Sequence, residues 1–125
     1  MRPVMSIVFV ALLTVLQSIT WAQAQKLQIH FMDVGQGDGA ILISPNGETV
    51  LFDNGVYNQC TKPMDYLTSL GITKIDYQII SHYHADHFGC TAAVLVKFQL
   101  QQFAFDRGGS YHGAVYNTYV QSVGA

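Results

Sequence analysis

The alternation of apolar and polar residues predicts short strands at the start of the chain. Residues 27–33 alternate with period two, which is typical of a strand with one covered face. The glycine-rich residues 34–39 end that strand. Two short apolar runs, 40–44 and 49–53, then flank Pro45-Asn46-Gly47, and this order predicts a β-hairpin.

The rest of the chain predicts helices that alternate with strands. A helix is expected from Pro63, which suits the first helical position, to Gly71, which favours termination. Residues 75–81 predict a buried strand, because their apolar residues include an adjacent pair. The pattern as a whole predicts an α/β fold, with a layered sheet and helices outside it. The remaining expected elements are helices over 89–97 and 113–123 and a strand over 102–105.

The first 24 residues predict an export signal. Arg2 supplies one positive charge, an uncharged and mostly apolar run follows over 4–22, and Ala22-Gln23-Ala24 fits the small-x-small pattern of a cleavage site. The alternative is an uncleaved anchor helix, because the run approaches the ~20 residues that span a bilayer. We therefore expect a signal peptide over 1–24 and one domain over 25–125, with no stable membrane anchor after cleavage. The expected location is secreted or periplasmic, where disulfides form.

Composition excludes several classes of protein. Half of the residues are apolar and only 11% are charged, which excludes a disordered chain. The net charge is −2, and loss of Arg2 with the signal makes it −3, so the chain offers no basic surface for nucleic acid. Two cysteines without CxxC spacing are too few for a disulfide-stapled scaffold or a zinc ribbon. One small globular domain, or a piece of a larger one, remains.

Four candidate metal ligands follow the predicted buried strand: His82, His84, Asp86 and His87. Imidazole and carboxylate are preferred ligands of zinc and its neighbours. Four ligands exceed what one tetrahedral ion takes from a tight loop, so the spacing predicts two adjacent divalent ions, with zinc as the expected identity. A histidine-rich surface loop without metal is the alternative. The complete HxHxDH pattern, followed by Gly89, favours the metal site.

We call residues 81–87 (SHYHADH) the histidine loop, and this segment resembles the HxHxDH signature of the metallo-β-lactamase fold. Residues 33–55 (DVGQGDGAILISPNGETVLFDNG) are similar to the opening of that fold in one branch, which includes the metallo-hydrolase domain of ComEC-type competence proteins. The resemblance implies an αββα sandwich with a two-metal site at one edge. That fold needs a second half with further strands and ligands, so we expect this chain to be its N-terminal half.

The resemblance also implies roles for individual residues. His82 and His84 would ligate the first metal. Asp86 and His87 would ligate the second, or Asp86 would orient the bridging water if the second position is empty. Asp53 matches an aspartate beneath the histidine loop, where it would orient a ligand imidazole through the other ring nitrogen. A turn aspartate bonded to local backbone is the equal alternative.

Other polar residues are expected to be less central. Asp33 and Asp38 flank the glycine loop, residues 34–39, which would shape the site rather than catalyse. Residues 106–109 resemble a stretch that forms a wall of the site, with a surface salt pair as the alternative. His30 is expected to face solvent, and His112 is expected to lie in a loop or at a helix start.

The two cysteines are expected to form a disulfide. In the implied fold the strands that end at Asp53 and Ser81 run side by side, so the loops carrying Cys60 and Cys90 emerge at the same edge. An exported chain reaches an oxidising compartment, which permits the bond. The alternatives are two buried free thiols, or Cys90 as a soft metal ligand.

These observations predict a secreted metal-dependent hydrolase that uses a metal-bound hydroxide, with Asp86 as its catalytic residue. The branch points to phosphodiester substrates, and other small-molecule esters fit the same chemistry. Nucleic acid is a weaker expectation because the chain is acidic. A non-catalytic or truncated metal-binding protein of the same fold is the main alternative, and redox chemistry at a di-iron centre is a third.

Overall fold

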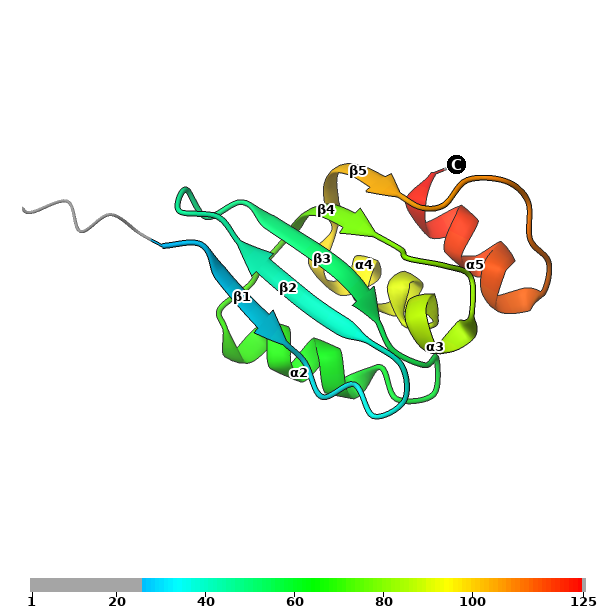
Figure 1. Ribbon diagram of the computed structural model, residues 1–125, viewed down its shortest axis with the longest axis horizontal. Coiled ribbons are helices and arrows are strands. Elements are labelled where there is room, and N and C mark those ends of the chain that lie inside the picture. Colours follow the sequence, from blue (N-terminus) through cyan, green and yellow to red (C-terminus); the bar gives the residue numbers. More distant parts are fainter. Residues whose placement is uncertain (1–25, 125) are drawn as a thin grey trace, which may run out of the picture.

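The computed structural model describes residues 26–124 and shows one mixed sheet with helices on one of its faces (Figure 1). The strands lie in the order β1-β2-β3-β4-β5; β1, β2 and β3 pair antiparallel, whereas β3, β4 and β5 pair parallel. The predicted α/β class is confirmed, and the predicted signal peptide lies outside the described residues. The strands are β1 (Gln28–Phe31), β2 (Gly39–Ile43), β3 (Thr49–Asn54), β4 (Ile75–Ile79) and β5 (Leu100–Phe105).

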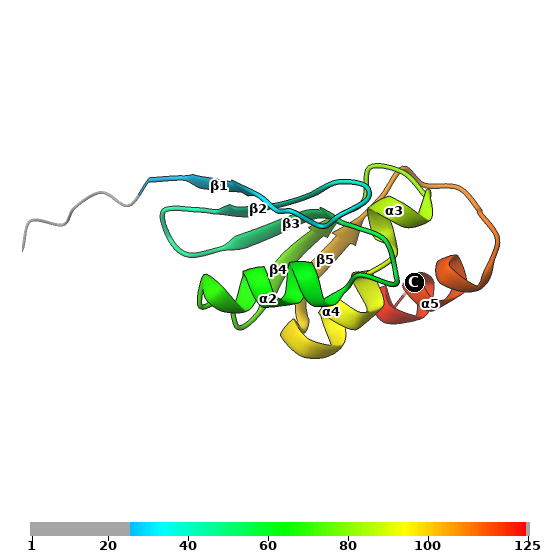
Figure 2. The same ribbon diagram turned by 90° about the horizontal axis from the view of Figure 1, so that it is seen from below.

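The helices α2 (Thr61–Ser69) and α4 (Thr91–Phe98) pack on the same face of the sheet (Figure 2). Two further helices, α3 (Ala85–Phe88) and α5 (Ala114–Val123), lie at one end. The first predicted helix begins two residues early, because proline is tolerated anywhere in the first turn, where backbone N–H groups lack intrahelical partners. Within residues 26–124, no helix has the length and apolar character needed to cross a membrane.

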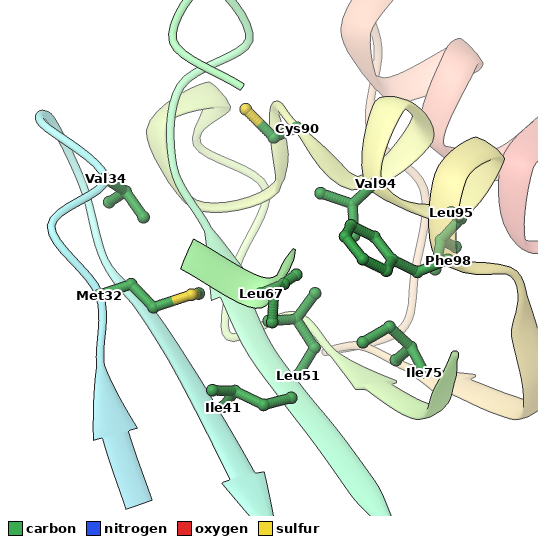
Figure 3. Close-up of a cluster of buried hydrophobic side chains, with 10 residues drawn as sticks. All are labelled: Met32, Val34, Ile41, Leu51, Leu67, Ile75, Cys90, Val94, Leu95 and Phe98. Atoms are coloured by element: carbon green, nitrogen blue, oxygen red, sulfur yellow. The ribbon is translucent and has the colours of Figure 1, made fainter. Parts of the chain in front are cut away.

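A hydrophobic core fills the space between the sheet and these helices (Figure 3). Ile41 and Leu51 face each other across β2 and β3, and both side chains are fully buried. They meet Leu67 of α2 and Val94 and Phe98 of α4, which are equally buried. Each such side chain contributes about 1.5–3 kcal/mol by burial. The core therefore fixes the carboxyl ends of β3 and β4, where the polar residues of interest lie.

The opposite face of the sheet is apolar and carries no described helix (Figure 2). Cross-strand pairing arranges its side chains in two rows. Exposure along the rows reaches 83% at Phe31 and 62% at Phe103. The row nearer the histidine loop is Phe31, Ala40, Phe52, Ile79 and Phe105, and the farther row is Ile29, Leu42, Val50, Tyr77 and Phe103.

The prediction that His30 faces solvent is wrong. His30 lies on the helix-covered side, where its Nδ1 is 3.2 Å from the hydroxyl of Tyr66 on α2. Its neighbour Phe31 is the exposed residue instead. Period-two alternation separates the two faces of a strand but does not say which face the helices cover.

Candidate metal centre

The histidine loop begins where β4 ends. Because β3 and β4 are parallel neighbours, the residues that follow them meet at one edge of the sheet. Ile80 is buried and its N–H donates to the carbonyl of Phe105, which extends the pairing with β5 by one residue. Tyr83, in the middle of the loop, is also buried. Asp86 and His87 lie on α3, the short helix that closes the loop and that the sequence did not predict.

Asp53 lies beneath the histidine loop, with only 1% of its surface exposed. Its Oδ1 accepts the Ser81 N–H at 2.9 Å, and its Oδ2 lies 2.6 Å from Ser81 Oγ and 2.9 Å from His87 Nδ1. These partners are 28 and 34 residues away in sequence, so the carboxylate bonds across the fold and not within its own turn. Asp53 has a positive φ of 48°, a conformation that non-glycine residues adopt only when their surroundings fix them.

The hydrogen bonds of Asp53 assign the protons of two imidazole rings. A carboxylate only accepts hydrogen bonds, so Ser81 Oγ donates its single proton to Asp53. Ser81 Oγ must then accept from His82 Nδ1, which lies 3.0 Å away, while His87 Nδ1 donates directly to Asp53. Both rings thus carry their proton on Nδ1, so Nε2 is the nitrogen of each ring that keeps a lone pair; the Nε2 lone pair of His82 faces His84 Nδ1.

His82 and His84 bring two ring nitrogens together. His82 Nε2 lies 3.1 Å from His84 Nδ1. Two nitrogens bound to one tetrahedral zinc at 2.0–2.1 Å lie about 3.3–3.4 Å apart, so the chemistry and spacing of this pair fit a shared divalent ion. Within residues 26–124, no group of three or more His, Cys, Asp or Glu side chains converges on one metal position.

The glycine loop packs against the histidine loop. Gly37 has a φ of +89°, and a Cβ at this position would overlap the carbonyl oxygen of Asp86. Asp86 itself is half-buried, with Gln36 Nε2 as a distant partner at 3.5 Å. Asp38 is exposed and lies 3.7 Å from His87 Nδ1. The glycine loop therefore contacts the histidine loop, as expected for a segment that shapes the site.

Two residues that the sequence interpretation gave no role also hold the site. One is Ser81, the relay between Asp53 and His82 described above. The other is Asn54, which is fully buried; its Oδ1 accepts the Cys90 N–H at 3.1 Å and its Nδ2 donates to Thr91 Oγ1 at 2.9 Å. In the sequence, the only feature that pointed to a role for Asn54 was its position next to Asp53 at a strand end. For Ser81 it was its position in the histidine loop.

The predicted disulfide between Cys60 and Cys90 is present, with a Cα–Cα distance of 5.2 Å. It joins the residue before α2 to the residue before α4. A disulfide sulfur has no thiolate to offer a metal, so the alternatives of free thiols and of Cys90 as a ligand are wrong. The bond ties the segment after the histidine loop to the chain that follows β3.

Residues 106–109 contact the histidine loop through Tyr83. The Arg107 guanidinium lies over the Tyr83 ring, 4.8 Å from its centre. Asp106 accepts hydrogen bonds from the Tyr119 hydroxyl at 2.7 Å and the Gly108 N–H at 2.8 Å, and burial together with this carboxylate raises the pKa of Tyr83 and of Tyr119. Both phenols stay protonated, and residues 106–109 form a wall beside the loop. His112 is exposed and its ring stacks on Tyr111.

A pocket of about 440 Å³ opens at this edge of the sheet. One end is polar and the other is formed by the open apolar face. The lining residues are Phe31, Met32, Gly37, Asp38, Gly39, Ala40, Phe52, Asp53, Ser81, His82 and His87.

Comparison with known families gives one match. A family profile described as "Metallo-beta-lactamase superfamily" matches residues 39–118, which is more than half of the chain and includes the whole histidine loop. A search of curated protein sequences gives no match.

Solved structures share the fold over part of their length. A metallo-beta-lactamase from Cronobacter sakazakii with a mutated HARLDQ motif has a TM-score of 0.52 at 20% identity, covering 61% of this chain and 30% of its own. MEM-A1, a subclass B3 metallo-beta-lactamase from a soil metagenome library, has a TM-score of 0.51 at 18% identity, covering 61% of this chain and 28% of its own. The chain thus matches less than a third of the length of each of these two structures.

Proposed function

Because this chain belongs to the metallo-beta-lactamase superfamily, we propose that its histidine loop is one part of a two-metal centre that hydrolyses an ester-like bond. Membership of the superfamily suggests a metal-dependent hydrolase. One observation of this chain supports the proposal above others. The Asp53 carboxylate holds the protons of His82 and His87 on Nδ1, directly or through Ser81, so that Nε2 is the nitrogen of each ring with a lone pair to offer a metal.

The proposed ligand sets follow from the free nitrogens. His82 Nε2 and His84 Nδ1, 3.1 Å apart, would hold the first ion. His87 Nε2 and the Asp86 carboxylate would hold the second, or Asp86 would orient the reacting water where the second position is empty. When bound, divalent ions, with zinc as the proposed identity, supply a water acidified to a pKa of ~7 and neutralise charge on the reacting oxygens. Asp53 keeps the two imidazoles oriented throughout.

We propose that the remaining ligands and the cover of the apolar face lie outside residues 26–124. The described residues bring two nitrogens together but no third donor, and the chain spans about 30% of the solved structures that it resembles. We propose that the active enzyme contains a second sheet-and-helix layer, as in an αββα sandwich. That layer would pack on the two apolar rows and supply ligands to the same edge.

The finer assignments are also proposals. The resemblance to the branch with ComEC-type competence proteins supports a phosphodiester or another small-molecule ester as substrate. The negative net charge gives little support for nucleic acid. The disulfide between Cys60 and Cys90 supports a secreted or periplasmic location, since such bonds persist in oxidising compartments.

The proposal is tested by replacing the paired histidines in the complete protein, with its proposed second layer, recovered from the medium or periplasm. His82→Ala and His84→Ala should each lower the zinc content and abolish hydrolysis of bis(p-nitrophenyl) phosphate. His112→Ala is the matched control, because His112 is exposed and outside the histidine loop. Full zinc content and full activity in either loop variant would refute the assignment. Wild-type protein without bound metal or turnover would favour a non-catalytic protein of this fold, and iron-coloured protein would favour redox chemistry.

A further inference from the structure

Tyr83 lies between the two paired histidines of the histidine loop. The backbone is extended at His84, with φ −78° and ψ 136°, and successive side chains of an extended backbone point to opposite sides. The rings of His82 and His84 accordingly lie together, with their centres 4.7 Å apart. The Tyr83 side chain points the other way, and Tyr83 is only 3% exposed. The placement of the Tyr83 ring therefore constrains the direction of both imidazoles.

An aromatic cluster encloses the Tyr83 ring. Its centre lies 4.9 Å from the ring centre of Tyr116 and 6.2 Å from that of Tyr119, both on α5. It lies 6.0 Å from the ring centre of Phe88 on α3, and the Arg107 guanidinium covers it at 4.8 Å. Aromatic pairs and cation–π pairs attract at these distances. Because two helices enclose the ring, a second layer on the open sheet face would not displace these contacts.

Asp106 fixes the wall against which Tyr83 packs. Its carboxylate accepts hydrogen bonds from the Tyr119 hydroxyl at 2.7 Å and from the Gly108 N–H at 2.8 Å, and so joins α5 to the segment that follows β5. Burial and the same carboxylate raise the pKa of Tyr83, which keeps the phenol neutral inside the cluster. The histidine loop is thus held from two sides, by Asp53 and by the aromatic cluster.

We propose that Tyr83 is a positioning residue of the metal centre, whose buried ring fixes the backbone between His82 and His84 so that both imidazoles face one ion. The inference rests on the proposed function, which gives the pair a metal to bind. The two facing nitrogens already lie 3.1 Å apart. Ordering flexible side chains costs conformational entropy, and a loop that is already fixed loses less of it when a ligand binds. Tyr83 therefore raises the metal affinity without contacting the metal.

Matched substitutions in the complete protein test this role. Tyr83→Leu removes the ring from the cluster, and Tyr83→Phe keeps it. Phe98→Leu is the control, because Phe98 is a buried aromatic residue of the main core, 2% exposed. Tyr83→Leu should weaken zinc binding by about tenfold, the lower end of the effect seen for residues that orient metal ligands. Tyr83→Phe and Phe98→Leu should bind zinc like the wild type, even where the melting temperature falls.

The metal-free protein gives a readout that needs neither zinc nor turnover. The rings of His82 and His84 are close enough for a nuclear Overhauser effect between their protons. This ring-to-ring effect should be present in the wild type, Tyr83→Phe and Phe98→Leu, and lost in Tyr83→Leu. With cobalt(II) in place of zinc, the visible absorption spectrum reports the geometry of the ligands and should change in Tyr83→Leu alone.

Wild-type zinc affinity together with an intact ring-to-ring effect in Tyr83→Leu would overturn the positioning role. Equal losses of affinity in Tyr83→Leu and Phe98→Leu would also overturn it, since both rings would then act only through stability. If Tyr83→Leu does not fold, Tyr116→Leu removes the nearest ring of the cluster and should lower the zinc affinity in the same direction; an unchanged affinity would overturn the role. If the wild type binds no zinc and hydrolyses nothing, the hydrolase proposal fails, and the ring-to-ring effect still decides whether Tyr83 fixes the pair.

Discussion

The Asp53 carboxylate lies 2.9 Å from Nδ1 of His87, and the same oxygen lies 2.6 Å from the hydroxyl of Ser81. One buried carboxylate thus directs the Nδ1–H of His87 on α3 towards itself, and it orients His82 through the serine. The two rings stand close together, with their centres 3.9 Å apart. Asp53 therefore joins the end of β3 to the histidine loop, two segments that meet only after the sheet has formed.

Asp53→Asn should weaken zinc binding by about 10–100-fold, the usual cost of losing a partner that orients a ligand histidine. The new amide NH₂ can donate towards His87 Nδ1, which would move the ring proton to Nε2 and remove the lone pair needed by the metal. Competition with a chromophoric chelator measures the affinity. Asp65→Asn, on the exposed side of α2, should bind zinc like the wild type. An unchanged dissociation constant for Asp53→Asn would contradict the role given to this carboxylate.

Asp86→Asn should keep the fold and one bound metal but lose most of the hydrolytic rate. The Asp86 carboxylate has one distant side-chain partner, Gln36 at 3.5 Å, so its charge contributes little to folding. The loss would fall on the second metal position or on the orientation of water. Metal per chain, melting temperature and rate, measured on the same preparation, separate these effects. A wild-type rate would make Asp86 a structural residue.

The histidine loop was predictable, because its candidate metal ligands lie close together in one short segment of the sequence. The hairpin of β2 and β3 was equally local, since its turn residues and apolar runs adjoin in sequence. The position of Asp53 came from resemblance, but its partners depend on the parallel register of β3 and β4. No periodicity in the sequence encodes that register.

Other features were not predictable because they depend on packing. The alternation of residue types around His30 and Phe31 does not show which face of the strand is covered. Only the docking of α2 decides which of the two residues is covered. Asn54 satisfies a backbone group 36 residues away and a side chain 37 residues away, contacts that exist only after α4 has packed. α3 is a single turn within a polar loop, too short to produce a periodic signal.

Loss of the disulfide should destabilise the chain by about 3–4 kcal/mol, from the entropy of closing a loop with a sequence separation of 30 residues. The double variant Cys60→Ala/Cys90→Ala, compared with the wild type by urea unfolding, measures this difference. The variant should also bind zinc less tightly, because Cys90 follows the histidine loop closely.

Intact mass with alkylation is the check on the bond itself. Two alkylatable cysteines without reductant would show that the exported protein lacks it.

The acid sensitivity of the fold should depend on Asp76, at the start of β4. Asp76 is 4% exposed, and it accepts the Thr49 N–H at 2.9 Å and pairs with Lys74. Burial alone would raise the pKa of this carboxyl, but the Lys74 ammonium and the Thr49 donors outweigh burial and lower it below 3.8. The unfolded chain therefore takes up this proton at a higher pH than the folded chain does.

It follows that the stabilisation from ionised Asp76 is complete above its ordinary pKa of 3.8 and is lost as the pH falls through the lowered folded value. Asp76→Asn should lower the free energy of unfolding at neutral pH by about 1–3 kcal/mol, because the charged acceptor of the Thr49 hydrogen bonds is lost. The ion pair with half-exposed Lys74 adds little to this loss. The gap between wild type and variant should narrow as the pH drops below 3.8, since protonation removes the same charge from the wild type. Urea unfolding of both proteins across the acid range, with Asp65→Asn as the exposed control, tests this. Parallel curves for wild type and Asp76→Asn would mean that another group governs the acid transition.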